Sequence, residues 1–159
     1  MLESDFNGIL TKSLNESGWF GFKIGDQRSS LTQFHSKNPY DLFGYYKGKF
    51  VCCESKWLKK PSAFNFTRLE DHQIENLIKA YEMLDDCLSI FAIGVDYGRG
   101  DKRVFVWKNS DLYHIKERNE LKNNIYKKEF DTLKNYVKIK KGLVNFDEIL
   151  ELPPFKENK

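Results

Sequence analysis

The chain alternates between segments with helical and with strand-like spacing of apolar residues. Residues 3–16 carry apolar side chains at positions 6, 9, 10 and 14, and Gly18 follows as a stop signal, so we predict a first helix there. Residues 69–84 show the same spacing, with acidic residues near their start, which predicts a second helix.

Strand-like segments lie between and after these helices. "WFGFKIG" from residue 19 predicts a short strand, and "DLFGYYKGKFVCCESKW" at residues 41–57 predicts two paired strands around a tight turn at Lys47 and Gly48. "CLSIFAIGVDY" is typical of the buried centre of a sheet, and "RVFVWK" predicts the strand that follows it. Beyond residue 108 we expect a short helix, a short strand and a last helix. This order predicts an α/β fold, a central mixed sheet flanked by helices.

Composition is that of an ordinary globular domain. The 159 residues are 40% hydrophobic and 31% charged, enough to bury a core. We predict a single domain over residues 1–159, with a core of about residues 1–110 and a basic extension of about residues 111–159. The start has no signal-peptide pattern and no stretch is long and apolar enough to span a membrane, so we expect a cytoplasmic protein without a membrane partner. The three cysteines have no metal or redox spacing, which favours reduced core thiols.

Positive charge is concentrated in one part of the chain. The net charge is +3, yet residues 99–141 contain 13 Lys and Arg against 6 Asp and Glu. A basic field of this kind suits a polyanionic partner. A solvated lysine-rich surface explains the same excess, so charge alone leaves both interpretations open.

Three charged residues flank the predicted hairpin of residues 41–57. Because side chains alternate along a strand, Glu54 and Lys56 share one face and Ser55 lies on the other. The turn brings Asp41 back toward Glu54, so two carboxylates and an ammonium converge at one end of the sheet. The bland alternative is a structural ion pair of Glu54 and Lys56 at the end of an edge strand.

Unpaired charges on an apolar strand are costly to bury, so these groups need solvent or a shared partner. A divalent cation would be such a partner, since Mg²⁺ takes one or two carboxylates together with water and phosphate oxygens. Such an ion lowers the pKa of a bound water and neutralises charge on a phosphate, and Lys56 would position that water or stabilise the transition state.

Pro39, Asp41, Glu54 and Lys56 resemble the signature of the PD-(D/E)xK nucleases, and the wider likeness is to RecU-type Holliday junction resolvases. The turn "GYYKGK" at residues 44–49 and the block "FNFTRLEDHQIENL" at residues 64–77 are similar to further blocks of that family. The resemblance covers residues 38–110 best and implies a restriction-endonuclease-like core. Tyr40, Cys52 and a short segment before Asp41 depart from the family pattern and bear on which DNA shape is cut.

The resemblance also implies roles for individual residues. The catalytic residues would be Asp41, Glu54, Lys56 and Gln73. The metal ligands would be Asp41, Glu54, the carbonyl of Ser55 and an acid of the first helix, for which Glu3 is our candidate and Glu16 the reserve. The ion would be Mg²⁺, with Mn²⁺ as a substitute.

Basic side chains on loops and turns near these residues would contact DNA phosphates without reading base sequence. They are Arg28, Lys37, Lys47, Lys49, Lys59, Lys60 and Arg68. Trp57, Phe64 and Phe66 would either stack on exposed bases or cover the core.

By resemblance, the chain is a Mg²⁺-dependent endodeoxyribonuclease that cleaves four-way or other branched DNA in recombination and repair, leaving a 5′-phosphate. We expect a homodimer, because a two-fold symmetric junction needs two matched cuts. The compact single-domain plan would suit a phage or mobile-element protein. Two alternatives stay open: a restriction-like or repair nuclease of linear duplex DNA, and a non-catalytic DNA-binding accessory protein of recombination.

Overall fold

Six strands form one mixed sheet in the computed structural model, which describes residues 1–23, 40–46 and 48–155. The strands follow one another across the sheet in chain order; β3 and β4 are parallel, and the other neighbouring pairs are antiparallel. Their bounds are β1 Phe20–Lys23, β2 Leu42–Tyr46, β3 Lys49–Leu58, β4 Cys87–Asp96, β5 Lys102–Lys108 and β6 Tyr136–Lys138.

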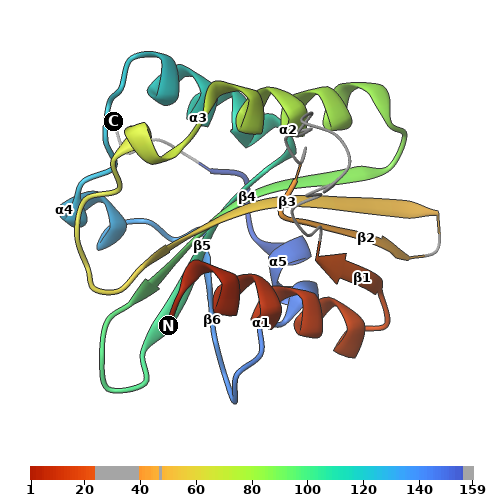
Figure 1. The fold of residues 1–159 in the computed structure, drawn as a ribbon, viewed down its shortest axis with the longest axis horizontal. Helices are drawn as coiled ribbons and strands as arrows, with labels where there is room; N and C mark the ends of the chain where they lie inside the picture. The colour runs from red at the N-terminus through yellow and green to blue at the C-terminus, as the bar shows by residue number, and fades with distance from the viewer. Residues whose placement is uncertain (24–39, 47, 156–159) are drawn as a thin grey trace, which may run out of the picture.

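Helices cover both faces of this sheet (Figure 1). Helices α2 (Asp71–Met83) and α3 (Leu112–Glu120) lie above it in the figure, and α1 (Glu3–Glu16) and α5 (Phe146–Glu151) lie below it. A single turn, α4 (Lys127–Phe130), and the 3₁₀ turns η1 (Phe66–Arg68) and η2 (Asn109–Asp111) connect these elements. The α/β architecture predicted from the sequence is confirmed.

Strand β3 contributes to a separate core on each face of the sheet. Cys52 packs with the α2 and α3 side, whereas Val51, Cys53 and Trp57 pack with the α1 and α5 side. The neighbouring thiols of Cys52 and Cys53 therefore point to opposite faces of the sheet, as strand alternation requires. Helix-covered faces on both sides explain why β3 and β4 read as apolar runs rather than as alternating patterns.

Most predicted elements are found where the apolar spacing placed them. Helix α1 spans residues 3–16, β1 and the β2–β3 hairpin follow, and α2 begins at Asp71. The short strand and helix expected near the end of the chain are β6, which pairs with β5, and α5. None of the helices in the described ranges is long and apolar enough to cross a membrane.

Candidate active site

Asp41 directly precedes β2, at the end where the pairing of β2 with β3 stops. Its backbone N–H donates to the carbonyl of Cys53 at 3.0 Å, and its carboxylate Oδ2 accepts from the backbone N–H of Ser55 at 2.9 Å. The carboxylate therefore continues the β2–β3 ladder one step beyond the backbone pairing. Asp41 is fixed beside Glu54 by this arrangement, as the hairpin predicted.

Glu54 and Lys56 lie on the α2 face near the end of β3 and are buried, with 2% and 7% of each residue exposed. Lys56 Nζ lies 3.0 Å from Glu54 Oε1, so the two form an ion pair. Gln73 Nε2 donates to the same Glu54 oxygen at 2.5 Å. β3 pairs with β2 only up to Cys53, so Glu54 and Lys56 lie on the part of β3 that pairs with β4 alone.

Both polar atoms of the Gln73 side-chain amide make hydrogen bonds. Its Oε1 accepts from the backbone N–H of Glu70 at 2.9 Å, which caps the start of α2, while its Nε2 holds Glu54. A glutamine at the third helical position is a common partner in such a cap. The start of α2 thereby sets the orientation of the Glu54 carboxylate.

Glu3, at the start of α1, closes the other side of the cluster. Its Oε1 lies 3.5 Å from Lys56 Nζ, and its Oε2 lies 3.2 Å from Nη2 of Arg68. Arg68 also donates to the carbonyl of Trp57 at 3.2 Å. Glu3 is therefore brought to the cluster as expected of a first-helix acid, held there by two cations.

Asn7 is a member of the cluster that sequence reasoning missed. It lies one turn after Glu3 on α1, is 6% exposed, and accepts a hydrogen bond from Ser55 Oγ through its Oδ1. Its position on the buried stripe of α1, together with Phe6, Leu10 and Leu14, was the available signal, because a polar residue on an apolar stripe needs a partner.

The charges of this cluster perturb one another. Burial raises the pKa of Glu54, the nearby Asp41 carboxylate raises it further, and the pKa reaches about 8 although Lys56 opposes the shift. Burial lowers the pKa of Lys56, but the carboxylates of Glu54 and Glu3 outweigh burial and raise it overall. Lys56 is therefore a cation at neutral pH, whereas its surroundings favour the protonated form of Glu54.

The donor set of this cluster fits a hard divalent cation. Cys53 O, Ser55 N–H and Trp57 O all have partners on the β2 side of β3, so the alternation of the strand directs the Ser55 carbonyl to that same edge, next to Asp41. Two carboxylates and one carbonyl match what Mg²⁺ takes from a protein. No group of three or more His, Cys, Asp and Glu side chains with metal-site geometry occurs among the described residues.

Other predicted site residues are distributed over the molecule. Lys59, Lys60 and Arg68 are exposed near the end of β3 where the cluster lies. Lys49 starts β3 and lines a hollow at its opposite end, and Glu16 ends α1 beside Lys138 and Lys140. Pro39 of the motif and the three basic residues Arg28, Lys37 and Lys47 lie outside the described residues.

The three aromatic residues near the site cover the core. Trp57 is 4% exposed, and Phe64 and Phe66 are fully buried, so none of them presents a ring for base stacking.

The two departures from the family pattern also have structural partners: Tyr40 Oη donates to the carbonyl of Asn76 at 3.5 Å, and Cys52 Sγ lies 3.9 Å from Cys87 Sγ in the core.

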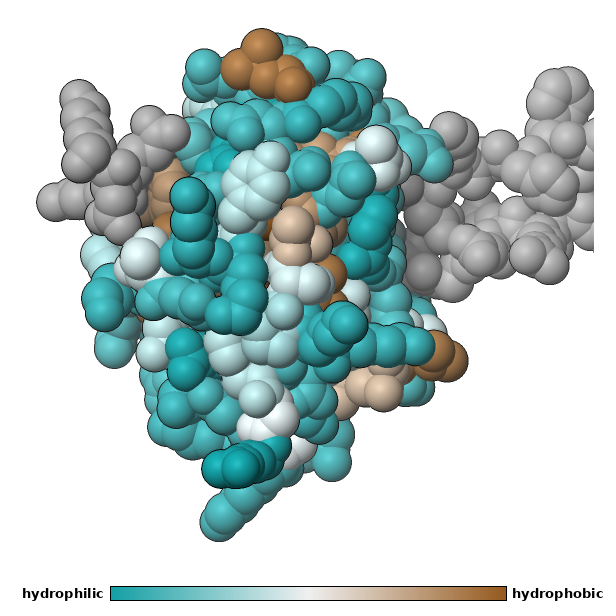
Figure 2. Space-filling view, turned by 90° about the vertical axis from the view of Figure 1, so that its left-hand side faces the viewer, coloured by the Kyte–Doolittle hydropathy of each residue, from teal (hydrophilic) through white to brown (hydrophobic). Residues whose placement is uncertain are grey.

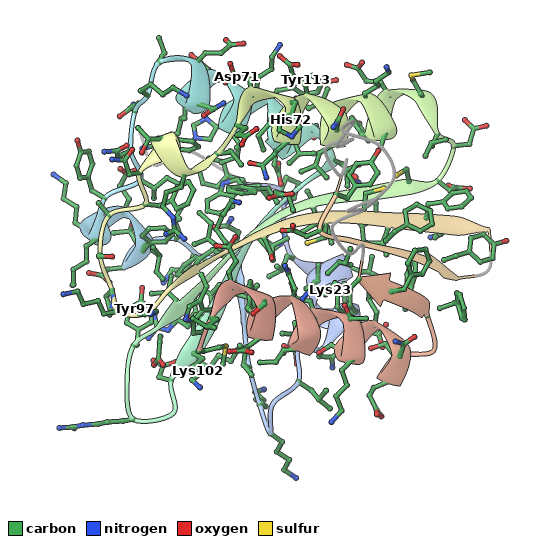
Figure 3. The ribbon with its side chains drawn as sticks, viewed as in Figure 1. Lys23, Asp71, His72, Tyr97, Lys102 and Tyr113 are labelled. Carbon is green, nitrogen blue, oxygen red and sulfur yellow. The ribbon has the colours of Figure 1, made fainter. Side chains whose placement is uncertain are left out.

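The side of the molecule at the left of Figure 1, toward which β3 runs, is mostly hydrophilic in Figure 2. Figure 3 shows Asp71 and His72 at the start of α2, and Tyr97 and Lys102 at the β4–β5 connection toward the same side. Because β3 and β4 are parallel, this connection and the end of β3 are neighbours. Arg99 on the connection is exposed and adds positive charge there.

The chain is similar to a known protein family and to a solved structure. A model of the family described as RecU, recombination protein U, matches residues 22–151. No curated protein matches the chain. Among solved structures, Hjc of Archaeoglobus fulgidus, a Holliday junction resolvase from an archaeal hyperthermophile, is similar at 15% identity and a TM-score of 0.39, over 73% of this chain and 98% of that one.

Proposed function

Because the chain belongs to the RecU family, whose members are Holliday junction resolvases, we propose that the cluster of Asp41, Glu54 and Lys56 is the active site with which it cleaves junction DNA. The observation that carries this proposal is the convergence of two carboxylates, a buried lysine and a glutamine at the end of β3. The resolvases of this family are endonucleases.

Asp41, Glu54 and the Ser55 carbonyl would hold Mg²⁺, or Mn²⁺ in its place. When bound, the ion supplies a water of lowered pKa and positive charge beside the scissile phosphate. Gln73 and Lys56 keep Glu54 in the orientation for this task. Lys56 stays protonated, so it offers an ammonium to the charge that develops on the phosphate rather than a general base. Glu3 would then serve to hold Lys56 and Arg68, or join the site through a water.

The exposed basic side chains Lys59, Lys60 and Arg68 would hold DNA phosphates beside this cluster. Since the substrate is DNA in recombination, we place the protein in the cytoplasm.

Carboxamide variants test the site assignment directly. We expect Asp41→Asn and Glu54→Gln each to lower cleavage of a synthetic four-way junction by at least about a hundredfold, while junction binding in a gel-shift assay survives. Asp85→Asn and Glu75→Gln, which change exposed acids of the same type, should cleave like the wild type. Wild-type cleavage rates in both site variants would refute the assignment.

The same assay compares the junction with a linear duplex of the same sequence. Preferential cleavage of the junction is the expected result; equal cleavage of the duplex would favour a restriction-like or repair nuclease. Binding without any cleavage in Mg²⁺ or Mn²⁺ would favour an accessory DNA-binding protein.

A homodimer is the second element of the proposal. Phe20, Phe22, Phe43, Tyr45 and Phe50 form a continuous set of ring contacts across β1, β2 and β3, with Phe20 73% and Phe22 45% exposed. We assign the subunit contact to this aromatic surface, since an exposed apolar patch on an edge strand is unfavourable in a monomer.

Sedimentation velocity tests the dimer. We expect the wild type to sediment as a dimer and the double variant Phe20→Ser, Phe22→Ser as a monomer. Leu121→Ser removes an equally exposed apolar side chain from another part of the surface and should leave the dimer intact. A dimer that survives the double variant would place the contact elsewhere.

A further inference from the structure

Asn7 is buried against the metal-ligand candidates without being one of them. Its Oδ1 accepts from Ser55 Oγ, and Ser55 in turn donates its backbone N–H to Asp41 Oδ2 at 2.9 Å. The hydroxyl oxygen Ser55 Oγ also lies 3.4 Å from Asp41 Oδ2. A chain of contacts thus runs from α1 through β3 to the carboxylate at the end of β2.

Ser55 has one hydroxyl proton to donate and two nearby acceptors, Asn7 Oδ1 and Asp41 Oδ2. The closer of the two acceptors is Asn7. With the hydroxyl proton directed to Asn7, Asp41 Oδ2 receives only the backbone N–H, and the other lone pairs of the carboxylate stay available. Without Asn7, the hydroxyl would turn to Asp41 and occupy one of those lone pairs.

We propose that Asn7 is a positioning residue of the metal site: it draws the Ser55 hydroxyl away from Asp41 and so keeps that carboxylate directed and available for the divalent cation. This inference rests on the proposed function of Asp41 as a ligand. It assigns to α1 a contribution to the site that is separate from Glu3, which acts on the side of Lys56 and Arg68. Groups that orient metal ligands by hydrogen bonds typically affect metal affinity by about 10- to 100-fold.

Mn²⁺ binding to the full chain, measured by calorimetry without DNA, tests the proposal. We expect Asn7→Ala to weaken Mn²⁺ binding about tenfold. Asn7→Ser, which keeps a polar group but withdraws the acceptor from Ser55 Oγ, is measured alongside and should show the same loss. Asn7→Asp keeps the acceptor and should bind more tightly than Asn7→Ala.

Ser55→Ala separates a positioning role from direct contact, because it removes the hydroxyl and keeps the backbone N–H and carbonyl. Without the hydroxyl there is nothing for Asn7 to draw away, so Asn7→Ala should cause no further loss of affinity in the Ser55→Ala background. Losses that multiply in the double variant would overturn the proposal, as would an Asn7→Ala affinity within about twofold of the wild type.

Ser13→Ala is the matched control on the same helix. Ser13 is 1% exposed, donates to the carbonyl of Ile9 and accepts from the N–H of Val144 at 2.8 Å, far along α1 from the site. Its loss should lower the melting temperature and leave Mn²⁺ affinity unchanged; a matching loss of affinity would mean that Asn7 acts only through stability.

Asp41→Asn distinguishes a failure of this inference from a failure of the proposed function. If the wild type binds no Mn²⁺, or Asp41→Asn binds it equally well, the site itself is wrong. If Asp41→Asn abolishes binding and Asn7→Ala does not alter it, only the role of Asn7 is refuted.

Discussion

Glu54 lies in surroundings that disfavour its charged form. It is 2% exposed and lies near the Asp41 carboxylate, and its ion-pair partner Lys56 is shared with Glu3. Such a group is stabilised either by a proton or by a further cation, and the proposed metal site would use the second. In the proposed site, relief of the cost of holding Glu54 charged in the folded chain would contribute to the affinity for the ion.

This cost predicts a pH dependence of stability in EDTA. Glu54 has a pKa of about 8 when folded against an ordinary 4.5, so between these values the folded chain holds a proton that the unfolded chain has lost. The stabilisation is complete below the unfolded pKa and is lost as the pH rises through the folded one. We expect the melting temperature of the wild type, relative to Glu54→Gln, to fall from pH 5 to pH 9.

Saturating Mn²⁺ should flatten that relative decline, since the cation replaces the proton. A difference between wild type and Glu54→Gln that is independent of pH in EDTA would contradict the perturbed state of Glu54.

At the scale of elements, the site depends on the close approach of β4 to β3. Gly94 stands opposite Trp57 in the parallel pair, and the ring of Trp57 lies where a side chain at residue 94 would begin. Phe6 packs on the same ring, with 5.2 Å between centroids. Trp57 and Phe6 adjoin Lys56 and Asn7 in the chain, so the packing around Gly94 supports both sides of the site.

Gly94→Ala should therefore destabilise the protein by about 1–3 kcal/mol through overpacking and reduce junction cleavage by displacing Trp57 and Lys56. Thermal unfolding and the cleavage assay measure the two effects. Gly8→Ala is the control: a Cβ there meets nothing within 4 Å, and the change should stabilise α1 by roughly 0.5–1 kcal/mol. Normal stability of Gly94→Ala would contradict the packing argument.

Local patterns predicted the elements that local interactions determine. Helix α1 follows from its apolar spacing, and the approach of Asp41 to Glu54 follows from a hairpin with a short turn. The parallel pairing of β3 with β4 requires the crossover through α2, and spacing alone does not specify the partner of a strand. Contacts between residues far apart in the sequence likewise cannot be predicted from local patterns. Asn7 and Ser55 are 48 positions apart, and Glu3 and Arg68 are 65 apart.

For the whole molecule, the distribution of positive charge matters more than the net charge of +3. Acidic side chains gather in the cluster while exposed Lys59, Lys60, Arg68 and Arg99 lie on the side toward which β3 runs. This arrangement would orient a polyanion across the site, and its strength should depend on salt.

Lys59→Ala and Lys60→Ala, each in the non-cleaving Asp41→Asn background, should lower the slope of log affinity against log salt concentration by about 1 for a four-way junction. Filter binding over a range of salt concentrations measures this slope. Lys79→Ala, which removes an exposed lysine from α2, should leave it unchanged. Unchanged slopes in both loop variants would place the DNA on another surface.

The ladder between β2 and β3 ends at Asp41, while β3 continues to Leu58. Along that outer edge, the Asp41 carboxylate accepts a hydrogen bond from the N–H of Ser55, and Arg68 donates one to the carbonyl of Trp57. A bare strand edge is a template on which other chains can add strands and aggregate, and charged side chains across it prevent this. The residues that would handle DNA would therefore also protect the protein from aggregation along this part of β3, so their loss would affect solubility as well as catalysis.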